Sequence, residues 1–112
     1  MKTIIILSHG SKSKNSNVLT EKVAKGVSDA LNQKVVPPYL NDVVQNEYDL
    51  GTREFIIHPF FLHKGVHVKH DIPGEIEALK SKYPDASFSL TDVTGASELI
   101  IKAVIGLVRR SL

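Results

Sequence analysis

The apolar residues of this 112-residue chain form short runs that alternate with stretches of helical periodicity. Residues 3–7 and 54–57 are continuous runs rich in β-branched residues, residues 87–91 favour a further strand, and residues 34–37 can form at most a short one. Runs that are apolar throughout are typical of strands covered on both faces, as in a parallel sheet. The pattern therefore predicts four strands, of which the second is short.

Two helices are predicted in the first half of the chain. The first has Asn15 or Ser16 as its N-cap. Its apolar residues recur at helical spacing, at Leu19, Val23, Val27, Ala30 and Leu31. The second begins near Pro38, because proline is accepted in the first turn of a helix, and Gly51 suits its C-terminal cap. Its apolar positions are Leu40, Val43 and Val44.

Two more helices are predicted in the second half. One begins at Pro73, with Asp71 as its N-cap, and presents Ile76, Leu79 and Tyr83 on one face. The other has the clearest pattern of all and extends from Ala96 to Arg110. Its broad apolar stripe comprises Leu99, Ile100, Ala103, Val104, Leu107 and Val108.

Strands and helices thus alternate from one end of the chain to the other. This order predicts a single α/β domain over residues 1–112, with a four-stranded parallel sheet, helices on both faces and right-handed crossovers. A chain of this length can bury one core. In such sheets ligands bind beyond the carboxyl ends of the strands.

Composition narrows the function classes. The net charge of +2 is well short of the basic stripe expected of a nucleic-acid binder. The chain has no cysteine, which excludes disulfides and thiolate metal sites and fits a reducing cytoplasm. No stretch approaches the ~20 apolar residues that span a bilayer, and the apolar start is too short for a signal peptide. The chain contains no glycine-rich phosphate-binding loop with the lysine of an NTPase.

Candidate chemistry lies in two segments that follow predicted strands. The first comprises residues 8–11 and contains His9. The second comprises residues 58–73 and holds the other four histidines. Neutral imidazole is a good ligand for iron, cobalt, nickel and zinc. Local physics does not single out one ligand in the second segment: His58 is better explained as a hydrogen-bonded core residue, and His63 and His70 as solvated or substrate-facing.

Lysines flank both segments. Lys12, Lys14, Lys64 and Lys69 are either ordinary surface residues or the positive rim of a site for a polycarboxylate. One exposed charge pair contributes only ~0.2–1 kcal/mol, so several lysines would have to converge on the ligand.

Three sequence motifs resemble one family. They are Ile5-Ile6-Leu7-Ser8-His9-Gly10-Ser11, then Pro59-Phe60-Phe61-Leu62, then Gly65-Val66-His67-Val68-Lys69-His70-Asp71-Ile72-Pro73. Together they are similar to those of the small class II chelatases, the CbiX/SirB-like group of sirohydrochlorin cobaltochelatases and ferrochelatases. The resemblance covers residues 3 to about 108.

The resemblance implies a homodimeric chelatase that inserts a divalent metal ion (cobalt, iron or nickel) into sirohydrochlorin, without an organic cofactor. His9 and His67 match the motif histidines and would act as metal ligands and proton acceptors. The expected substrate-binding residues surround them and, in one case, precede the last helix: Ser11, Lys12, Lys64, Gly65, Val66, Lys69 and Gly95. Gly95 would offer backbone N–H groups to a carboxylate. Phe60 and Phe61 would contact the ring, although at least one is expected in the core.

Two alternatives stay open at this point. Residues 33–38, around the second strand, are several residues shorter than in typical members of the family, and residues 91–97 lack the family's proline- and histidine-containing pattern. A protein trimmed in this way could bind a tetrapyrrole or a metal without turnover. The second alternative is an unrelated flavodoxin-like binding domain whose histidines are incidental.

Overall fold

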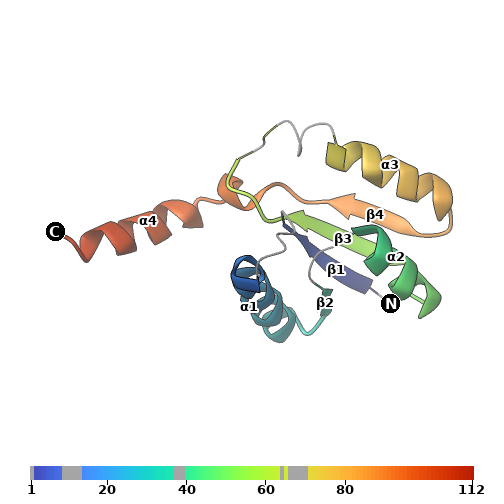
Figure 1. The fold of residues 1–112 in the computed structure, drawn as a ribbon, viewed down its shortest axis with the longest axis horizontal. Coiled ribbons are helices and arrows are strands. Elements are labelled where there is room, and N and C mark those ends of the chain that lie inside the picture. Colours follow the sequence, from blue (N-terminus) through green and yellow to red (C-terminus); the bar gives the residue numbers. More distant parts are fainter. Residues whose placement is uncertain (1, 9–13, 37–39, 64, 66–70) are drawn as a thin grey trace.

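The computed structural model describes residues 2–8, 14–36, 40–63, 65 and 71–112, with the backbone alone for residues 14–17 and 41. Strands and helices alternate as predicted (Figure 1). The elements are β1 (Lys2–Leu7), α1 (Lys14–Leu31), β2 (Lys34–Val36), α2 (Leu40–Asp49), β3 (Glu54–Pro59), α3 (Ile72–Lys82), β4 (Ser87–Leu90), the 3₁₀ turn η2 (Thr94–Ala96) and α4 (Leu99–Arg109).

The four strands form one parallel sheet in the order β2-β1-β3-β4. Ile4 lies between Val35 of β2 and Ile56 of β3, and Phe55 of β3 lies beside Phe88 of β4. The predicted α/β fold is confirmed, and the first and third strands are neighbours.

One face of the sheet carries the larger core. Alternate residues of a strand point to opposite faces, and Ile5, Phe55 and Ile57 point to the side covered by α2 and α3. The two phenylalanine rings Phe55 and Phe88 stack there with centroids 5.1 Å apart. The helices contribute Leu40, Val44, Ile72, Ile76, Leu79 and Tyr83.

The opposite face is covered by α1 over β1 and β2. Ile4 and Ile6 pack there against Ala24, with Val27 and Ile56 partly buried beside them. Helices therefore lie on both faces, as predicted.

The residues predicted for the buried stripe of α1 are partly wrong. Leu19 and Leu31 are more than half exposed, whereas Thr20 and Ala24 are buried. The predicted N-cap is also wrong, since the helix already includes Lys14 and therefore contains both Asn15 and Ser16.

Two features fix α2 at the amino-terminal edge of the sheet. Gly51 adopts a φ of 108° just after the helix, in the left-handed region that favours glycine, so the predicted cap is confirmed. The buried carboxylate of Glu47 accepts a hydrogen bond from the hydroxyl of Thr3 (3.2 Å) and forms an ion pair with Lys34 (2.7 Å). A buried carboxylate is tolerated only when it is paired in this way.

The last helix differs most from its prediction. It begins at Leu99 instead of Ala96, because the extended backbone of Ser97 separates it from η2. None of its residues is buried, and Figure 1 shows α4 projecting away from the sheet. The radius of gyration is 15.3 Å, above the value of about 13 Å expected for a compact chain of this length. Within the described residues, no helix is long and apolar enough to cross a membrane.

Candidate functional site at the carboxyl ends of the strands

The two histidine-bearing segments leave the sheet side by side. Leu7, the last residue of β1, is paired with Pro59, the last residue of β3. The N–H of Phe60 then donates to the carbonyl of Leu7 at 2.7 Å, which extends the strand pairing by one residue. Ser8 and Phe60 therefore begin their loops at the same edge of the sheet, where ligands bind in folds of this kind.

Most residues expected to act in the site lie outside the described part of the chain. These are His9, Ser11, Lys12, Lys64, Val66, His67 and Lys69. Gly65 is described and exposed, and Gly95 is described and partly buried. The roles assigned to all nine residues therefore stay predictions.

His58 is held by two threonines. Its Nδ1 lies 2.7 Å from Oγ1 of Thr91, and its Nε2 lies 2.7 Å from Oγ1 of Thr94. A neutral imidazole has one donor and one acceptor nitrogen, and a hydroxyl can serve either. Burial lowers the pKa of His58, which favours this neutral form. The prediction of a hydrogen-bonded histidine at this position is confirmed, and neither ring nitrogen is left for a metal.

Gly95 packs directly on the loop that follows β3. Its N–H donates to the carbonyl of Phe61 at 3.0 Å, and a Cβ at this position would overlap with the carbonyl group of Leu62. The amide of Gly95 is thus engaged by the protein itself. A carboxylate at this turn would have to use other amides or replace that bond.

These contacts tie β4 and η2 to the start of the histidine-rich loop, and sequence reasoning did not find them. Gly95 and the threonines lie more than thirty residues from their partners along the chain. The sequence signal available was a lone glycine and two ordinary threonines, which is too weak to reveal a contact.

The two phenylalanines after β3 pack on opposite faces of the sheet. Phe60 packs on the α1 side of the sheet, and Phe61 packs on the α2–α3 side. Both are partly buried, whereas Leu62 and His63 are exposed. The expectation that at least one phenylalanine belongs to the core is met.

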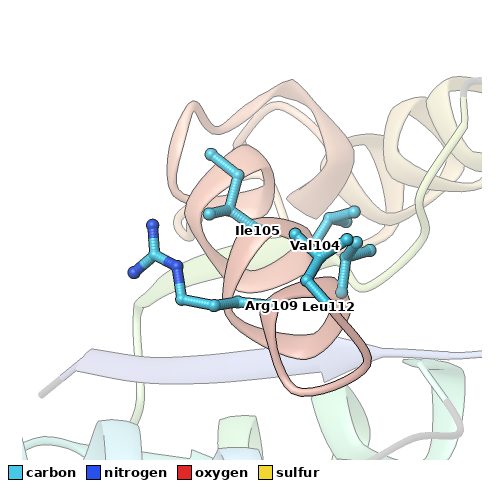
Figure 2. Close-up of a pocket in the computed structure, with 5 residues that line it drawn as sticks. Val104, Ile105, Arg109 and Leu112 are labelled. Atoms are coloured by element: carbon cyan, nitrogen blue, oxygen red, sulfur yellow. The ribbon is translucent and has the colours of Figure 1, made fainter.

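In the ranges that the structure describes, three or more histidine or carboxylate side chains do not come together as a metal site. The structure shows a hollow on α4, lined by Val104, Ile105, Val108, Arg109 and Leu112 (Figure 2). All five lining residues belong to α4 or to the end of the chain after it. This hollow is apolar apart from Arg109 and does not involve the loops that carry the motifs.

The fold and the paired loops define a class: a small parallel α/β domain with histidine-bearing loops at the carboxyl ends of two adjacent strands. The sequence model of the CbiX family matches residues 3–111, so the chain belongs to the CbiX family. An unrelated flavodoxin-like domain is thereby excluded.

Known proteins similar to this chain carry related names. The chloroplastic sirohydrochlorin ferrochelatase of Arabidopsis thaliana is 26% identical over 109 residues, which is 90% of this chain and 48% of that protein. A sirohydrochlorin cobaltochelatase of Methanopyrus kandleri is 28% identical over 81 residues, 65% of this chain and 57% of that protein. The chain thus spans about half the length of these curated relatives.

A solved structure extends the likeness to three dimensions. A putative cobalamin biosynthesis CbiX protein from Marinobacter aquaeolei VT8 matches with a TM-score of 0.84 and 25% identity. The match covers 99% of this chain and 97% of that one. The chain in that structure is therefore about as long as this one.

Proposed function

We propose that this protein inserts a divalent metal ion (cobalt, iron or nickel) into sirohydrochlorin. One observation carries the proposal: the two motif segments of a CbiX-family chain start at the paired ends of β1 and β3. The names of the relatives, sirohydrochlorin ferrochelatase and cobaltochelatase, agree with this reaction. The protein would thus be a lyase of tetrapyrrole biosynthesis.

His9 and His67 are the proposed metal ligands and proton acceptors. Metal insertion releases two pyrrole N–H protons and requires that the metal lose its bound water. A histidine with a pKa near neutrality can accept a proton or hold a metal, although one side chain does not do both at once. Several imidazoles are therefore needed around one ring. The metal is a substrate here, and no organic cofactor takes part.

The remaining site residues would bind the substrate. Sirohydrochlorin carries eight carboxylates, which suits the lysines Lys12, Lys64 and Lys69 around an apolar contact at Val66. Ser11 and Gly65 would contribute polar side-chain or backbone groups. Gly95 would do so by exchanging its bond to the carbonyl of Phe61 for one to a carboxylate. Charge complementarity of this kind speeds the encounter with an anionic ligand more than it tightens binding.

A second copy of the chain would supply the opposite wall of the cleft. One sheet has one carboxyl edge, so a single domain can enclose only one side of a flat macrocycle. A homodimer brings His9 and His67 from both copies and places four imidazoles around the ring. We place the reaction in the cytoplasm, because a chain without cysteine suits a reducing compartment.

The test is the change in absorbance of sirohydrochlorin on addition of Co²⁺, Fe²⁺ or Ni²⁺. The wild type should accelerate metal insertion, and His9→Ala and His67→Ala should reduce the rate to near the spontaneous one. His63→Ala is the matched control, because His63 is exposed at the start of the same loop. A wild-type rate no faster than the spontaneous reaction would contradict the proposal.

A second function is favoured by the short second strand. β2 comprises Lys34–Val36, and the region around it is shorter than in typical members of the family. A trimmed cleft could retain tetrapyrrole or metal binding and lose turnover. Stoichiometric binding of sirohydrochlorin without acceleration would support this carrier.

A further inference from the structure

Side chains continue the contact between β3 and β4 after the pairing of the two strands ends. The last paired residues are Ile57 and Leu90, and the N–H of Thr91 still donates to the carbonyl of Ile57 at 2.9 Å. Beyond this bond, the imidazole of His58 bridges Thr91 and Thr94, with each hydroxyl oxygen 2.7 Å from a ring nitrogen. His58 is therefore the residue that joins the end of β3 to η2.

The bonds around this imidazole run in one consistent direction. The hydroxyl of Thr91 has a single hydrogen, which it donates to the carbonyl of Asp92 at 3.0 Å. It therefore accepts the bond from His58, so Nδ1 carries the proton and Nε2 accepts from the hydroxyl of Thr94. Burial lowers the pKa of His58 and thereby favours this neutral ring. One tautomer of the neutral imidazole thus satisfies both ring nitrogens and both hydroxyls.

η2 connects this anchor with the histidine-rich loop. None of its three residues is buried, so hydrogen bonds contribute much of what holds it in place. Next to Thr94, the N–H of Gly95 donates to the carbonyl of Phe61 at 3.0 Å, and a Cβ on Gly95 would overlap with Leu62. The segment that carries His67 continues from Leu62. The bond to Thr94 therefore helps to fix the point from which that segment departs.

We propose that His58 is a positioning residue for metal insertion: by holding Thr94 it fixes η2, and η2 fixes the start of the loop that carries His67. This role rests on the proposed function and belongs to a residue that acts only through others. Both nitrogens of His58 are already bonded within the protein. A displacement of about 1 Å at a reacting group costs on the order of 10²-fold in rate, so a bond at the base of the loop matters for the reaction.

The first test removes the bond from either side and measures the rate of Co²⁺ insertion into sirohydrochlorin. Thr94→Val keeps the shape of the side chain and removes its hydroxyl, whereas His58→Phe keeps a ring and removes both nitrogens. Each should lower kcat by about tenfold or more. KM for sirohydrochlorin depends on contacts spread over several lysines and should change by less than about twofold. Thr94→Ser restores the hydroxyl and should restore kcat.

Two further variants separate a shared bond from general damage. If both substitutions break the same bond, His58→Phe combined with Thr94→Val should be no slower than the slower single variant. Thr52→Val is the matched control, because Thr52 is buried before β3 at the opposite end of the sheet and its hydroxyl lies 3.2 Å from that of Thr3. This control also loses a buried hydrogen bond, yet it should keep the wild-type kcat.

The second test follows the link itself and does not depend on activity. In Thr94→Val the amide hydrogen of Gly95 should exchange with solvent about tenfold faster or more, because η2 opens more often. The amide of Ser87, which donates to the carbonyl of Arg53 at 2.8 Å at the other end of β4, is the internal control and should be unchanged. Spectra of ¹⁵N-labelled histidine should show the proton of His58 on Nδ1 in the wild type and a mixture of both tautomers in Thr94→Val.

The failure of this role can be told apart from the failure of the proposed function. A wild type that does not accelerate insertion refutes the proposed function, and the positioning role falls with it. An active wild type with an equally active Thr94→Val refutes the positioning role alone, as does a Gly95 amide whose exchange is unchanged or a Thr94→Ser variant as slow as Thr94→Val. A loss of kcat in Thr52→Val as large as that in Thr94→Val would mean general destabilisation and would also overturn the role of His58.

Discussion

α3 and α4 are helices of equal length, but α3 is packed on the sheet and α4 is not. Each has eleven residues. α3 carries acidic and basic side chains, yet it buries Ile72, Ile76 and Leu79 against the sheet. α4 is far more apolar and buries nothing within one copy. The difference teaches that an apolar stripe indicates only that a helix has to be covered. Which surface covers the helix depends on where the chain leaves the preceding strand.

The largest expected effect tests the covered member of the pair. Leu79→Ala removes a side chain that is 4% exposed in the main core, and a deletion of this kind typically costs ~2–5 kcal/mol. Chemical denaturation should show this loss equally at low and high protein concentration. A loss below about 1 kcal/mol would mean that α3 is packed less tightly than the structure indicates.

Two glycines sharpen the comparison. Gly95→Ala would overlap with the carbonyl group of Leu62, whereas a Cβ at Gly106 in α4 meets nothing within 4 Å. We expect Gly95→Ala to destabilise by ~1–3 kcal/mol through overpacking. Gly106→Ala should be neutral, or stabilise by up to about 1 kcal/mol, because alanine is the better helix former.

Both glycine variants can be measured by thermal unfolding, with the rate of metal insertion as a second readout. Gly95→Ala should also slow insertion, since it displaces the start of the histidine-rich loop. Equal stability of the two variants would contradict the close contact at η2. A strong destabilisation by Gly106→Ala would instead show that the interface around α4 leaves no room for a methyl group.

A smaller effect tests the uncovered helix. Within one copy Leu107 is exposed, so Leu107→Ala should change stability by less than ~0.5 kcal/mol under dilute conditions. If α4 is covered by a second copy, stability rises with protein concentration by mass action and the cost of the variant rises with it. Denaturation curves at two widely separated concentrations decide this. If the loss of stability caused by Leu107→Ala does not change with protein concentration, α4 is not covered by a second copy, and the contrast with the concentration-independent loss in Leu79→Ala does not hold.

The smallest effect concerns His58, which holds η2 in place. Burial lowers its pKa in the folded protein below the ordinary value of 6.5. The unfolded chain therefore binds more protons as the pH falls through about 6.5, and the stability contributed by neutral His58 is lost from there down to the folded pKa. The free energy of unfolding should decrease from pH 7 to pH 5, and less steeply in His58→Gln. Identical slopes for the two proteins would refute the role of His58.

Much of the fold follows from local pattern. The runs at residues 4–7 and 55–57 are apolar at every position, and strands of this kind are typical of sheets that helices cover on both faces. Gly51 after α2 was predictable because the left-handed conformation it adopts favours glycine. The stripe of α1 was not, since Thr20 and Ala24 are buried while Leu19 and Leu31 are exposed. Which side of a helix faces the sheet depends on how the helix is placed, and hydropathy alone does not set this.

The candidate site, too, could be predicted from the sequence in part. The motifs around His9 and His67 belong to the family pattern, and the placement of their loops at one edge follows from strand order. His58 was correctly separated from the proposed ligands because it lies at the end of a buried strand. The pairing of His58 with Thr91 and Thr94 and the contact of Gly95 with Leu62 join positions distant along the chain.

The sequence by itself thus determined the alternation of strands and helices, the two histidine-bearing loops and the need of the last helix for a cover. Each follows from side-chain chemistry read over a few neighbouring residues. Only the tertiary structure decided that β1 and β3 are adjacent, that η2 is clamped to the loop after β3, and that α4 leaves the body uncovered. These depend on contacts between distant parts of the chain, whose formation is governed by packing and geometry and not by local preference.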